Sequence, residues 1–258
     1  MAHPGLTNMH IMKWLDADRT DGLKQGLLLG AAVLVLLLPP ARTGWVHVPA
    51  TGRNPAVAET IHRQLDFAGQ TSSREVREVA EWVVSAADNG SVPFAILDKR
   101  NAHVFVFDAG GRLQGSTPVL LGYAAGDDSV AGIGQRPIAD VRPEERTTPA
   151  GRFVAEPGRN AINEDVVWVD YEAAVSMHRV RLNNPSEHRL ERLASPTVSD
   201  NRISYGCINM PPEFFENVLW PNFRGRRGVV YVLPEVKPLA AVFPALARSS
   251  ASRAILPD

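Results

Sequence analysis

The pattern of apolar and polar positions along the 258-residue chain first marks an uncharged apolar run at residues 26–38, which ends at two prolines. Its length is typical of a signal-peptide core and falls short of the ~20 residues that span a bilayer comfortably. No Ala-x-Ala cleavage motif follows it. The run therefore predicts an export signal that is either cleaved or kept as a membrane anchor, with a buried core helix as the alternative.

A second pattern predicts one strongly amphipathic helix at residues 74–88. Apolar residues recur there at i, i+3, i+4, i+7, i+8 and i+11, starting from Val76. Ser73 precedes the pattern as an N-cap, and Asn89 and Gly90 follow it as a stop signal. An apolar stripe of this kind packs against a neighbouring layer, so we expect the helix to cover the domain that follows.

From Pro93 onward the period changes from helical to extended. Six runs rich in β-branched and aromatic residues are predicted as strands: 94–97, 104–107, 118–121, 166–169, 173–177 and 228–233. The first three are typical of an antiparallel meander. The interval 122–149 predicts a long loop, which either faces a substrate or simply lies at the surface. Residues 183–193 and 212–219 predict short helices, and the Pro-, Ala- and Ser-rich tail from residue 235 is expected outside the core.

The charge balance excludes a strong electrostatic field as the basis of function. Lys and Arg number 27 against 28 Asp and Glu, so a nucleic acid or a strongly acidic partner is not expected. Neither a paired metal-ligand spacing nor a phosphate-cradling glycine loop occurs, so no metal or cofactor is expected. With one cysteine, Cys207, no internal disulfide can form. These observations leave the oligomeric state open.

The single cysteine lies in the stretch Ser-Tyr-Gly-Cys-Ile-Asn, residues 204–209. Gly206 allows the backbone to turn tightly, which leaves the Cys207 sulfur and nearby N–H groups facing one space. A thiol acyl transferase needs this arrangement, because the sulfur attacks a carbonyl and the N–H groups hold the oxyanion. The alternative is a buried cysteine that serves only as a small apolar side chain.

Residues 204–209 resemble the active-site signature of the L,D-transpeptidase catalytic domain family (YkuD-like), in which Gly-Cys follows Ser or Thr and, usually, His. Two further segments agree in the same order. Residues 147–153 (Thr-Thr-Pro-Ala-Gly-Arg-Phe) resemble the family's Thr-Pro-x-Gly-x-Phe stretch, and residues 175–178 (Val-Ser-Met-His) resemble the apolar strand that ends in its catalytic histidine. This sequence departs from the family in having Tyr205 where His is commonest, and in a longer interval between the histidine and the signature.

The resemblance implies a mainly β, α+β fold, namely an L,D-transpeptidase-like β-sandwich with flanking helices. It covers residues 93–234, which form the implied catalytic domain. Before that domain we expect an N-terminal signal or membrane anchor at 1–42 and a linker with a helical segment at 43–92. A tail at 235–258 follows it.

By the same resemblance, the protein is an exported cysteine acyltransferase of peptidoglycan that joins peptide stems through a Cys thioester. Its implied partners are peptidoglycan peptide stems, and its implied roles are in cell wall organisation and cell shape. The implied location is the periplasm or cell envelope, with residues 26–38 as an inner-membrane anchor. An L,D-carboxypeptidase, in which water replaces the acceptor amine, and a catalytically inactive cell-wall-binding module are the alternatives.

The resemblance implies Cys207 as the nucleophile and His178 as the base that takes the thiol proton and returns it to the leaving amine. Further implied site residues are Gly206, Ser204 and Tyr205 as oxyanion or orienting groups, and Asn209 and Arg202 as substrate-binding groups. His188 is the rival base, since its spacing to the signature is closer to that usual in the family. His178 is preferred because an apolar strand precedes it, whereas charged residues surround His188 and indicate a solvated helical face.

Overall fold

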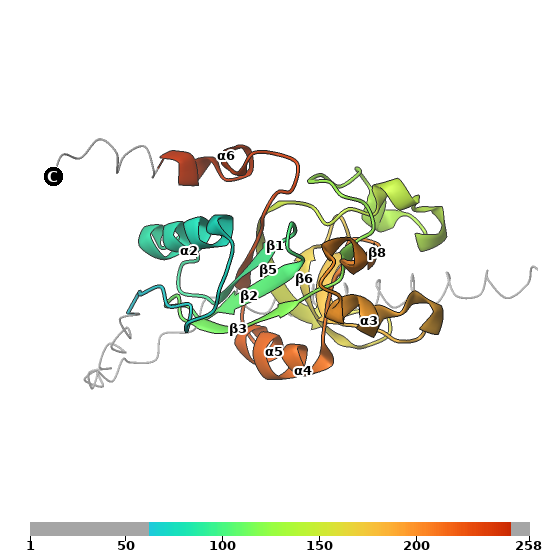
Figure 1. Ribbon diagram of the computed structural model, residues 1–258, viewed down its shortest axis with the longest axis horizontal. Helices are drawn as coiled ribbons and strands as arrows, with labels where there is room; N and C mark the ends of the chain where they lie inside the picture. Colours follow the sequence, from blue (N-terminus) through green and yellow to red (C-terminus); the bar gives the residue numbers. More distant parts are fainter. Residues whose placement is uncertain (1–61, 249–258) are drawn as a thin grey trace, which may run out of the picture. The chain divides into compact units, whose positions relative to one another are not determined.

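The structure is a computed structural model, and it describes residues 62–248 (Figure 1). The predictions for the export segment at 26–38, for the domain at 1–42 and for the tail from residue 249 onward lie outside the described residues. Among residues 62–248, no helix combines the length and the apolar character needed to cross a membrane. The described residues are mostly β, with few helices, so the predicted mainly β, α+β class is confirmed.

Most strands belong to one large sheet: β1 Phe94–Asp98, β2 His103–Phe107, β3 Leu113–Pro118, β5 Gly151–Arg159, β6 Asp165–Asp170, β7 Val175–Arg179, β9 Ile208–Met210 and β10 Gly228–Val232. Within the described residues these eight strands form a mixed sheet in the order β3-β2-β1-β10-β5-β6-β7-β9. Two short strands, β4 (Leu121–Gly122) and β8 (Arg202–Ser204), pair with each other in parallel. The predicted antiparallel meander is formed by β1, β2 and β3, but its third strand is β3 and not residues 118–121.

Strand β5 is missing from the sequence predictions, and it joins the two halves of the sheet. Its residues 151–155 pair antiparallel with β10, and its residues 156–159 pair antiparallel with β6. Hydrogen bonding therefore runs from one half of the sheet to the other through this single strand. Ala95 on β1 and Met177 on β7 lie in the same apolar core, so residues of both halves enclose it.

The helices are α2 Arg74–Ala86, α3 Arg189–Ala194, α4 Pro212–Phe214, α5 Trp220–Phe223 and α6 Leu239–Val242, with a π-helical turn at Phe215–Leu219 between α4 and α5. Helix α2 begins where the sequence predicts, because the Ser73 side chain accepts a hydrogen bond from the N–H of Val76. Its end differs from the prediction. Ala87 takes the left-handed conformation (φ 55°) and closes the helix before the expected stop at Asn89.

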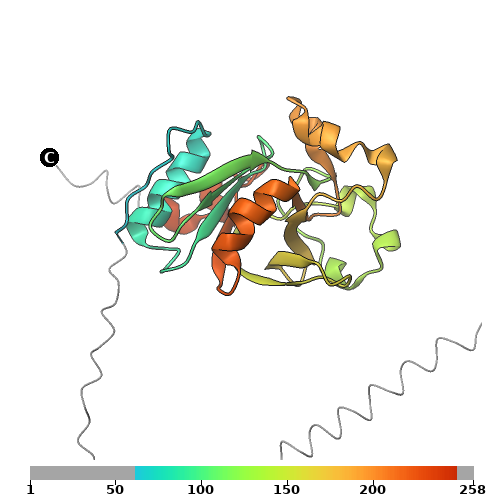
Figure 2. The ribbon, with the colours of Figure 1, turned by 90° about the horizontal axis from the view of Figure 1, so that it is seen from below.

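Alternate residues of β1 enter two different cores, as expected for a strand that is buried on both faces. Ala95 and Leu97 point into the core that both halves of the sheet share, and the α4–α5 segment covers this core. Phe94 and Ile96 point into a second core, which α2 covers. Helix α2 and the α4–α5 segment therefore pack on opposite faces of this part of the sheet (Figure 2).

The tail after residue 235 is corrected from an external segment to a part of the core. Phe243 and Leu246 are each 3% exposed and pack with α2. The Trp82 ring of α2 lies 5.9 Å from the Tyr231 ring and 6.5 Å from the Phe243 ring, measured between centroids. Removing these large apolar side chains from water holds the tail against the sheet.

The predicted long loop at 122–149 contains three short 3-10 turns: η1 Ile133–Gln135, η2 Ile138–Asp140 and η3 Pro143–Glu145. Glu145 holds the loop together, because its buried carboxylate accepts hydrogen bonds from the side chains of Arg142 and Arg136. These bonds lower the pKa of Glu145 to about 2. The loop is therefore built around its own ion-pair cluster.

Candidate active site

Two parallel strands, β7 and β9, bring the predicted nucleophile and base to one face of the sheet. Met177 pairs with Ile208, and His178 pairs with Asn209. Met177 and Ile208 are fully buried in the core shared by both halves of the sheet. Because side chains alternate along a strand, His178 and Asn209 point to the opposite face, and Cys207, directly before Ile208, belongs to that face as well.

The Cys207 sulfur lies against two polar groups at the start of β7. Ser176 Oγ is 3.7 Å from Sγ, and the carbonyl oxygen of Ala174 is 3.5 Å from it. Ala174 adopts a left-handed φ of 54° in the turn that leads into the strand. The cysteine itself is partly exposed. A purely apolar, buried role for Cys207 is therefore not supported, and its sulfur is within reach of a substrate.

His178 is held in one tautomer by its own backbone neighbour. Its Nδ1 lies 2.7 Å from the carbonyl oxygen of Arg179, so Nδ1 carries the proton and donates it. The Nε2 lone pair is then the one that can accept a proton. Burial lowers the pKa of His178 to about 4, and the nearby Arg181 and Arg189 cations act in the same direction. His178 is therefore neutral at pH 7, as a general base must be.

His178 and Cys207 share a face but form no hydrogen bond with each other within the described residues, where the sulfur contacts Ser176 and Ala174 instead. Catalytic hydrogen bonds are often long before a substrate binds and tighten in the complex. The approach of His178 Nε2 to the sulfur at hydrogen-bonding distance stays a prediction.

The turn before Cys207 requires glycine at position 206. Gly206 has a φ of 125°, and a Cβ atom built on it would lie 2.7 Å from the carbonyl oxygen of Thr147. The neighbouring Thr148, which is fully buried, supports the same turn. Its Oγ1 donates to the Gly206 carbonyl at 2.9 Å and accepts from the N–H of Gly122 at 2.9 Å. The Thr-Pro segment at 147–153 is therefore the support of the nucleophile turn, residues 204–207.

Replacing Gly206 by alanine is expected to displace the nucleophile turn, because the backbone conformation and the Thr147 contact both oppose a Cβ atom. We expect the free energy of unfolding to fall by about 1–3 kcal/mol. The acylation rate of Cys207 should fall at least about 10-fold, since small displacements of reacting groups are costly. Denaturant unfolding and single-turnover kinetics measure the two effects. Gly225→Ala is the control, because Gly225 also has a positive φ (77°) but no atom within 4 Å of its Cβ position.

The Ser204 side chain forms a hydrogen bond with the N–H of Gly206, one of the N–H groups expected to hold the oxyanion. The Ser204 hydroxyl accepts a hydrogen bond from the N–H of Gly206 at 3.1 Å and donates one to the carbonyl of Cys207 at 2.6 Å. The N–H of Gly206 is therefore paired within the turn, and its expected part in holding the oxyanion stays a prediction. The N–H of Cys207 has no acceptor among residues 62–248, so it is the donor that can face a developing oxyanion.

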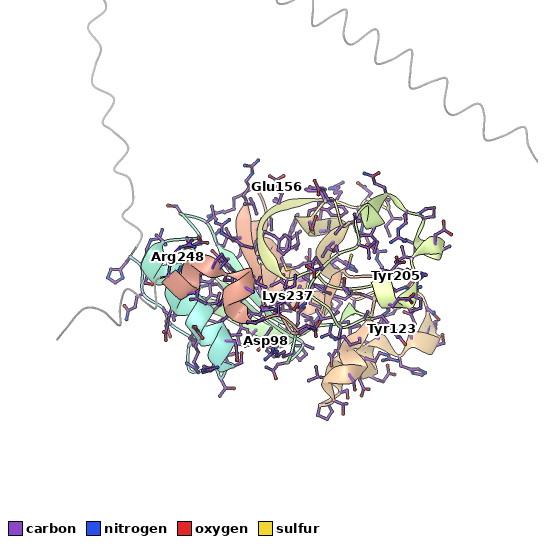
Figure 3. All side chains as sticks on the ribbon, turned by 90° about the horizontal axis from the view of Figure 1, so that it is seen from above. Asp98, Tyr123, Glu156, Tyr205, Lys237 and Arg248 are labelled. Atoms are coloured by element: carbon purple, nitrogen blue, oxygen red, sulfur yellow. The ribbon has the colours of Figure 1, made fainter. Side chains whose placement is uncertain are left out.

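Tyr205 lies at the surface, where it is 41% exposed. The guanidinium carbon of Arg146 lies 3.9 Å from the centroid of its ring, which is a close cation–π contact. Tyr123 is its neighbour on the same side of the protein, and the Tyr123 N–H donates to the carbonyl of Ser204 (Figure 3). Tyr205 therefore packs between the nucleophile turn and the long loop, and its orienting role stays a prediction.

Asn209 and Arg202, the two residues expected to bind substrate, are engaged with other protein groups in this structure. Asn209 is 1% exposed, and its amide donates to the Cys207 carbonyl at 3.1 Å and accepts from Arg189 at 2.7 Å. The side chain of Arg202 is 13% exposed and forms an ion pair with Glu235. Both side chains are therefore largely buried with their polar groups paired, and a direct contact of either with a substrate stays a prediction.

His188 lies on a polar surface, as expected from its charged sequence neighbours. Its side chain is 69% exposed, and its Nδ1 lies 3.9 Å from a Glu191 carboxylate oxygen. It stands between a 3-10 turn at Pro185–Glu187 and α3, with a left-handed φ of 48°. Its ring is not part of the β7–β9 pairing that brings His178 and Cys207 to one face. The structure therefore favours His178 as the base.

A buried lysine beside the long loop is absent from the sequence predictions. Lys99 is fully buried, and its Nζ donates to Asp127 at 2.7 Å and to the carbonyl of Thr148 at 2.9 Å. Burial alone would raise the pKa of Asp127, but hydrogen bonds from the Lys237 N–H and from Lys99 lower it to about 2. Thr148 also donates a hydrogen bond to the Gly206 carbonyl, so Lys99 supports the nucleophile turn indirectly, through Thr148.

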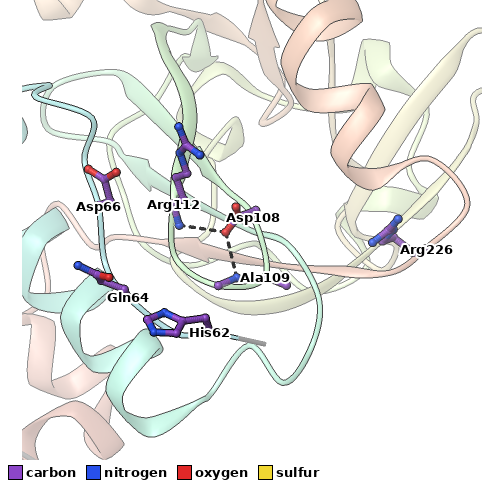
Figure 4. Close-up of a pocket in the computed structure, with 8 residues that line it drawn as sticks. His62, Gln64, Asp66, Asp108, Ala109, Arg112 and Arg226 are labelled. Carbon is purple, nitrogen blue, oxygen red and sulfur yellow. Dashed lines mark hydrogen bonds between the residues drawn. The ribbon is translucent and has the colours of Figure 1, made fainter. Parts of the chain in front are cut away.

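A pocket of about 540 Å³ lies at the turn between β2 and β3 and not at Cys207 (Figure 4). Its lining residues are His62, Gln64, Asp66, Asp108, Ala109, Gly110, Arg112 and Arg226. None of these residues is a predicted site residue. The candidate active site is therefore separate from this pocket and lies at Cys207 and His178. No group of three or more His, Cys, Asp or Glu side chains in residues 62–248 is arranged to hold a metal ion.

No protein-family model and no curated protein matches the chain. Solved structures similar to it include the Enterococcus faecium L,D-transpeptidase C442S mutant, with 18% identity over 55% of this chain and 50% of that one and a TM-score of 0.32. The helical cell shape determining protein Pgp2 from Campylobacter jejuni is 12% identical over 63% of this chain and 57% of its own, with a TM-score of 0.38. An L,D-transpeptidase from Mycobacterium smegmatis is 16% identical over 55% and 59%, with a TM-score of 0.33.

This chain spans between 50% and 59% of the length of those three structures. With TM-scores below 0.5, the similarities carry no argument about function.

Proposed function

We propose that the protein is a cysteine acyltransferase that acts on the peptide stems of peptidoglycan, as the resemblance of its three motif segments implies. The observation that carries the proposal is the register of β7 and β9, which sets a neutral His178 and a partly exposed Cys207 on one face of the sheet. A nucleophile and a base on neighbouring strands supply what thiol acyl transfer requires.

In the first step, His178 Nε2 takes the thiol proton while Cys207 Sγ attacks the carbonyl carbon before the terminal D-alanine of a tetrapeptide stem. The carbonyl electron pair moves to oxygen, where the N–H of Cys207 stabilises the negative charge. When this tetrahedral intermediate collapses, the C–N bond breaks and the imidazolium gives its proton to the leaving amine. D-alanine departs, and a thioester on Cys207 remains.

In the second step, the side-chain amine of diaminopimelate from another stem attacks the thioester carbonyl. His178 takes a proton from the attacking amine, the C–S bond breaks, and the proton returns to the sulfur. The product is a cross-linked stem pair. With water in place of the amine, the same residues would release a shortened stem, which is the L,D-carboxypeptidase reaction.

The proposed location is the periplasm or cell envelope, because peptidoglycan stems lie outside the cytoplasm and residues 26–38 suit an export signal or anchor. Fractionation of cells that express the full chain tests this point. Recovery of the full-length protein with cytosolic enzymes would contradict it.

Incubation of the full chain with a disaccharide tetrapeptide tests the proposed reaction. Cross-linked dimer together with free D-alanine is expected for an acyltransferase, whereas free D-alanine without dimer assigns water as the acceptor. Cys207→Ala should yield neither product. If the wild-type protein also yields neither product under these conditions, the catalytic proposal is wrong, and a cell-wall-binding role becomes the better account.

The pH dependence of acylation follows from the state of His178. Its neutral form is the base, and its pKa lies at about 4, so the rate should be held as pH falls through 6.5 and should drop only near pH 4. Rapid-mixing assays measure the acylation rate on the acid side of the pH profile, and circular dichroism at each pH shows whether the protein stays folded. An acid limb near pH 6.5 in the folded protein would show that the base is an exposed histidine.

A further inference from the structure

We propose that Arg189 is a positioning residue for Cys207 and acts through the side-chain amide of Asn209. The role of Cys207 as nucleophile belongs to the function proposed above, and this inference rests on it. Arg189 lies 20 residues from Asn209 along the chain and is outside every motif that the sequence singled out. The inference concerns how this chain fixes the direction of its nucleophile.

Helix α3 carries Arg189 to the face of the sheet on which His178 and Cys207 lie. Leu193, one turn further along the helix, packs in a small core with Val180 and Leu120. Val180 follows β7 and lies two residues after His178, so alternation places the two side chains on the same face. The packing of Leu193 in this small core therefore anchors α3 beside the strand that carries the base.

Arg189 Nη1 donates to Asn209 Oδ1 at 2.7 Å, and Asn209 Nδ2 donates to the carbonyl oxygen of Cys207 at 3.1 Å. The guanidinium also pairs with Glu187, so its own position is fixed. A cationic donor makes the first bond stronger than one between neutral groups. It also selects one of the two orientations of the Asn209 amide, because only one orientation turns the oxygen to Arg189 and the NH₂ group to Cys207.

The Cys207 carbonyl accepts a second hydrogen bond, from Ser204 Oγ at 2.6 Å. Two donors from different directions fix the plane of the peptide bond that follows Cys207. That plane sets the ψ angle of Cys207 and thus the direction of its Cα–Cβ bond, from which the thiol extends. Arg189, Asn209 and Ser204 are therefore parts of one clamp on the nucleophile.

Without Arg189, the buried Asn209 oxygen would lose its donor, and the amide would gain freedom to rotate. The clamp on the Cys207 carbonyl would then depend on Ser204 alone. Because a displacement of about 1 Å at a reacting group can cost about 100-fold in rate, a looser clamp should lower the rate of acylation more than substrate binding.

Arg192 offers a matched control on the same helix. Its Nε donates to the Glu187 carbonyl at 2.8 Å and its Nη1 to the Asp200 carbonyl at 2.9 Å. It is a partly buried arginine like Arg189, but neither of its hydrogen bonds goes to Asn209 or Cys207. Arg192→Gln should therefore reproduce the loss of a charge and of helix contacts without loosening the clamp.

The first test compares kcat and KM for D-alanine release by the full-length variants. Arg189→Gln should lower kcat by about 10- to 100-fold with KM within about 3-fold. Arg192→Gln should stay within about 3-fold for both. Arg189→Lys should recover part of the loss, since an ammonium can still donate to Asn209. Equal effects of Arg189→Gln and Arg192→Gln, or a kcat within about 3-fold of wild type for Arg189→Gln, would overturn the proposal.

A second test needs no catalysis and so separates this inference from the proposed function. NMR hydrogen exchange of the Asn209 side-chain NH₂ group should show slow exchange in the wild type, in Arg192→Gln and in Arg189→Lys. Arg189→Gln should speed this exchange at least about 10-fold while the β7 and β9 backbone amides stay protected. Unchanged Asn209 exchange in Arg189→Gln would refute the link, even in a protein that releases no D-alanine.

Discussion

Replacing His178 by alanine is expected to lower the rate of acyl-enzyme formation at neutral pH by at least about 1,000-fold. The substitution removes the group that takes the thiol proton and the group that protonates the leaving amine, which are the same ring. Cys207→Ala removes the atom that carries the acyl group, so this variant and the double variant should form no acyl-enzyme at all. Stopped-flow or quenched single-turnover assays measure the rate.

His188→Ala is the matched control for this result. It makes the same substitution at a histidine whose side chain is 69% exposed, and its rate should stay within about 3-fold of wild type. The reverse outcome, in which His188→Ala abolishes acylation and a folded His178→Ala still acylates, would transfer the base to His188. It would also make the family's usual spacing a better guide than the strand that carries His178.

Replacing Lys99 by methionine should have the largest effect on stability. Methionine keeps the length of the side chain but leaves the buried carboxylates of Asp127 and Glu235 without the ammonium that lies between them. Loss of one partner of a buried ion pair costs about 3–5 kcal/mol of unfolding free energy. Because Lys99 also holds the Thr148 carbonyl, the acylation rate should fall together with stability. Urea unfolding, followed by fluorescence, measures the first effect.

Lys237→Met makes the same substitution at a surface pair with Asp128, whose side chains are 43% and 73% exposed. We expect this variant to lose less than about 1 kcal/mol of unfolding free energy.

The dependence of stability on pH is a further check on the Lys99–Asp127 pair. The folded-state pKa of Asp127 is lowered to about 2, so its stabilising contribution is present above pH 4 and is lost as pH falls towards 2. A loss below about 1 kcal/mol for Lys99→Met would mean that the cluster is not a structural centre.

The elements that the sequence predicts correctly are those in which burial and period agree. Helix α2 has a full apolar stripe with an N-cap, and every residue of β1 and β10 is buried. Strand β5 lacks such a signal, because it includes Arg152, Glu156 and Pro157 and is mostly half-exposed. It is a strand because β10 and β6 flank it, which is information that no local window contains. The tail is misjudged for the same reason, since Phe243 is buried by Tyr231 of β10 and by Trp82 of α2, which is far from it in the sequence.

The candidate site divides along a similar line. The pairing of a cysteine stretch with a strand-borne histidine can be predicted from the sequence, because local motifs carry both residues. The supports of the site cannot. In the sequence, Lys99 is part of a polar turn and Arg189 is part of a solvated helix. In the structure, Lys99 is linked to the nucleophile turn through the buried Thr148. Arg189 is linked to it through the buried Asn209. Only the tertiary fold brings these partners together.

The most direct test of the central claim is intact-mass spectrometry of the full chain after brief exposure to a disaccharide tetrapeptide. The account predicts an adduct equal to the stem minus D-alanine, located by peptide mapping on Cys207. The adduct should form in wild type and His188→Ala and be absent from His178→Ala and Cys207→Ala. An adduct on another residue, or one that forms in His178→Ala at the wild-type rate, would contradict the assignment of Cys207 and His178 as nucleophile and base.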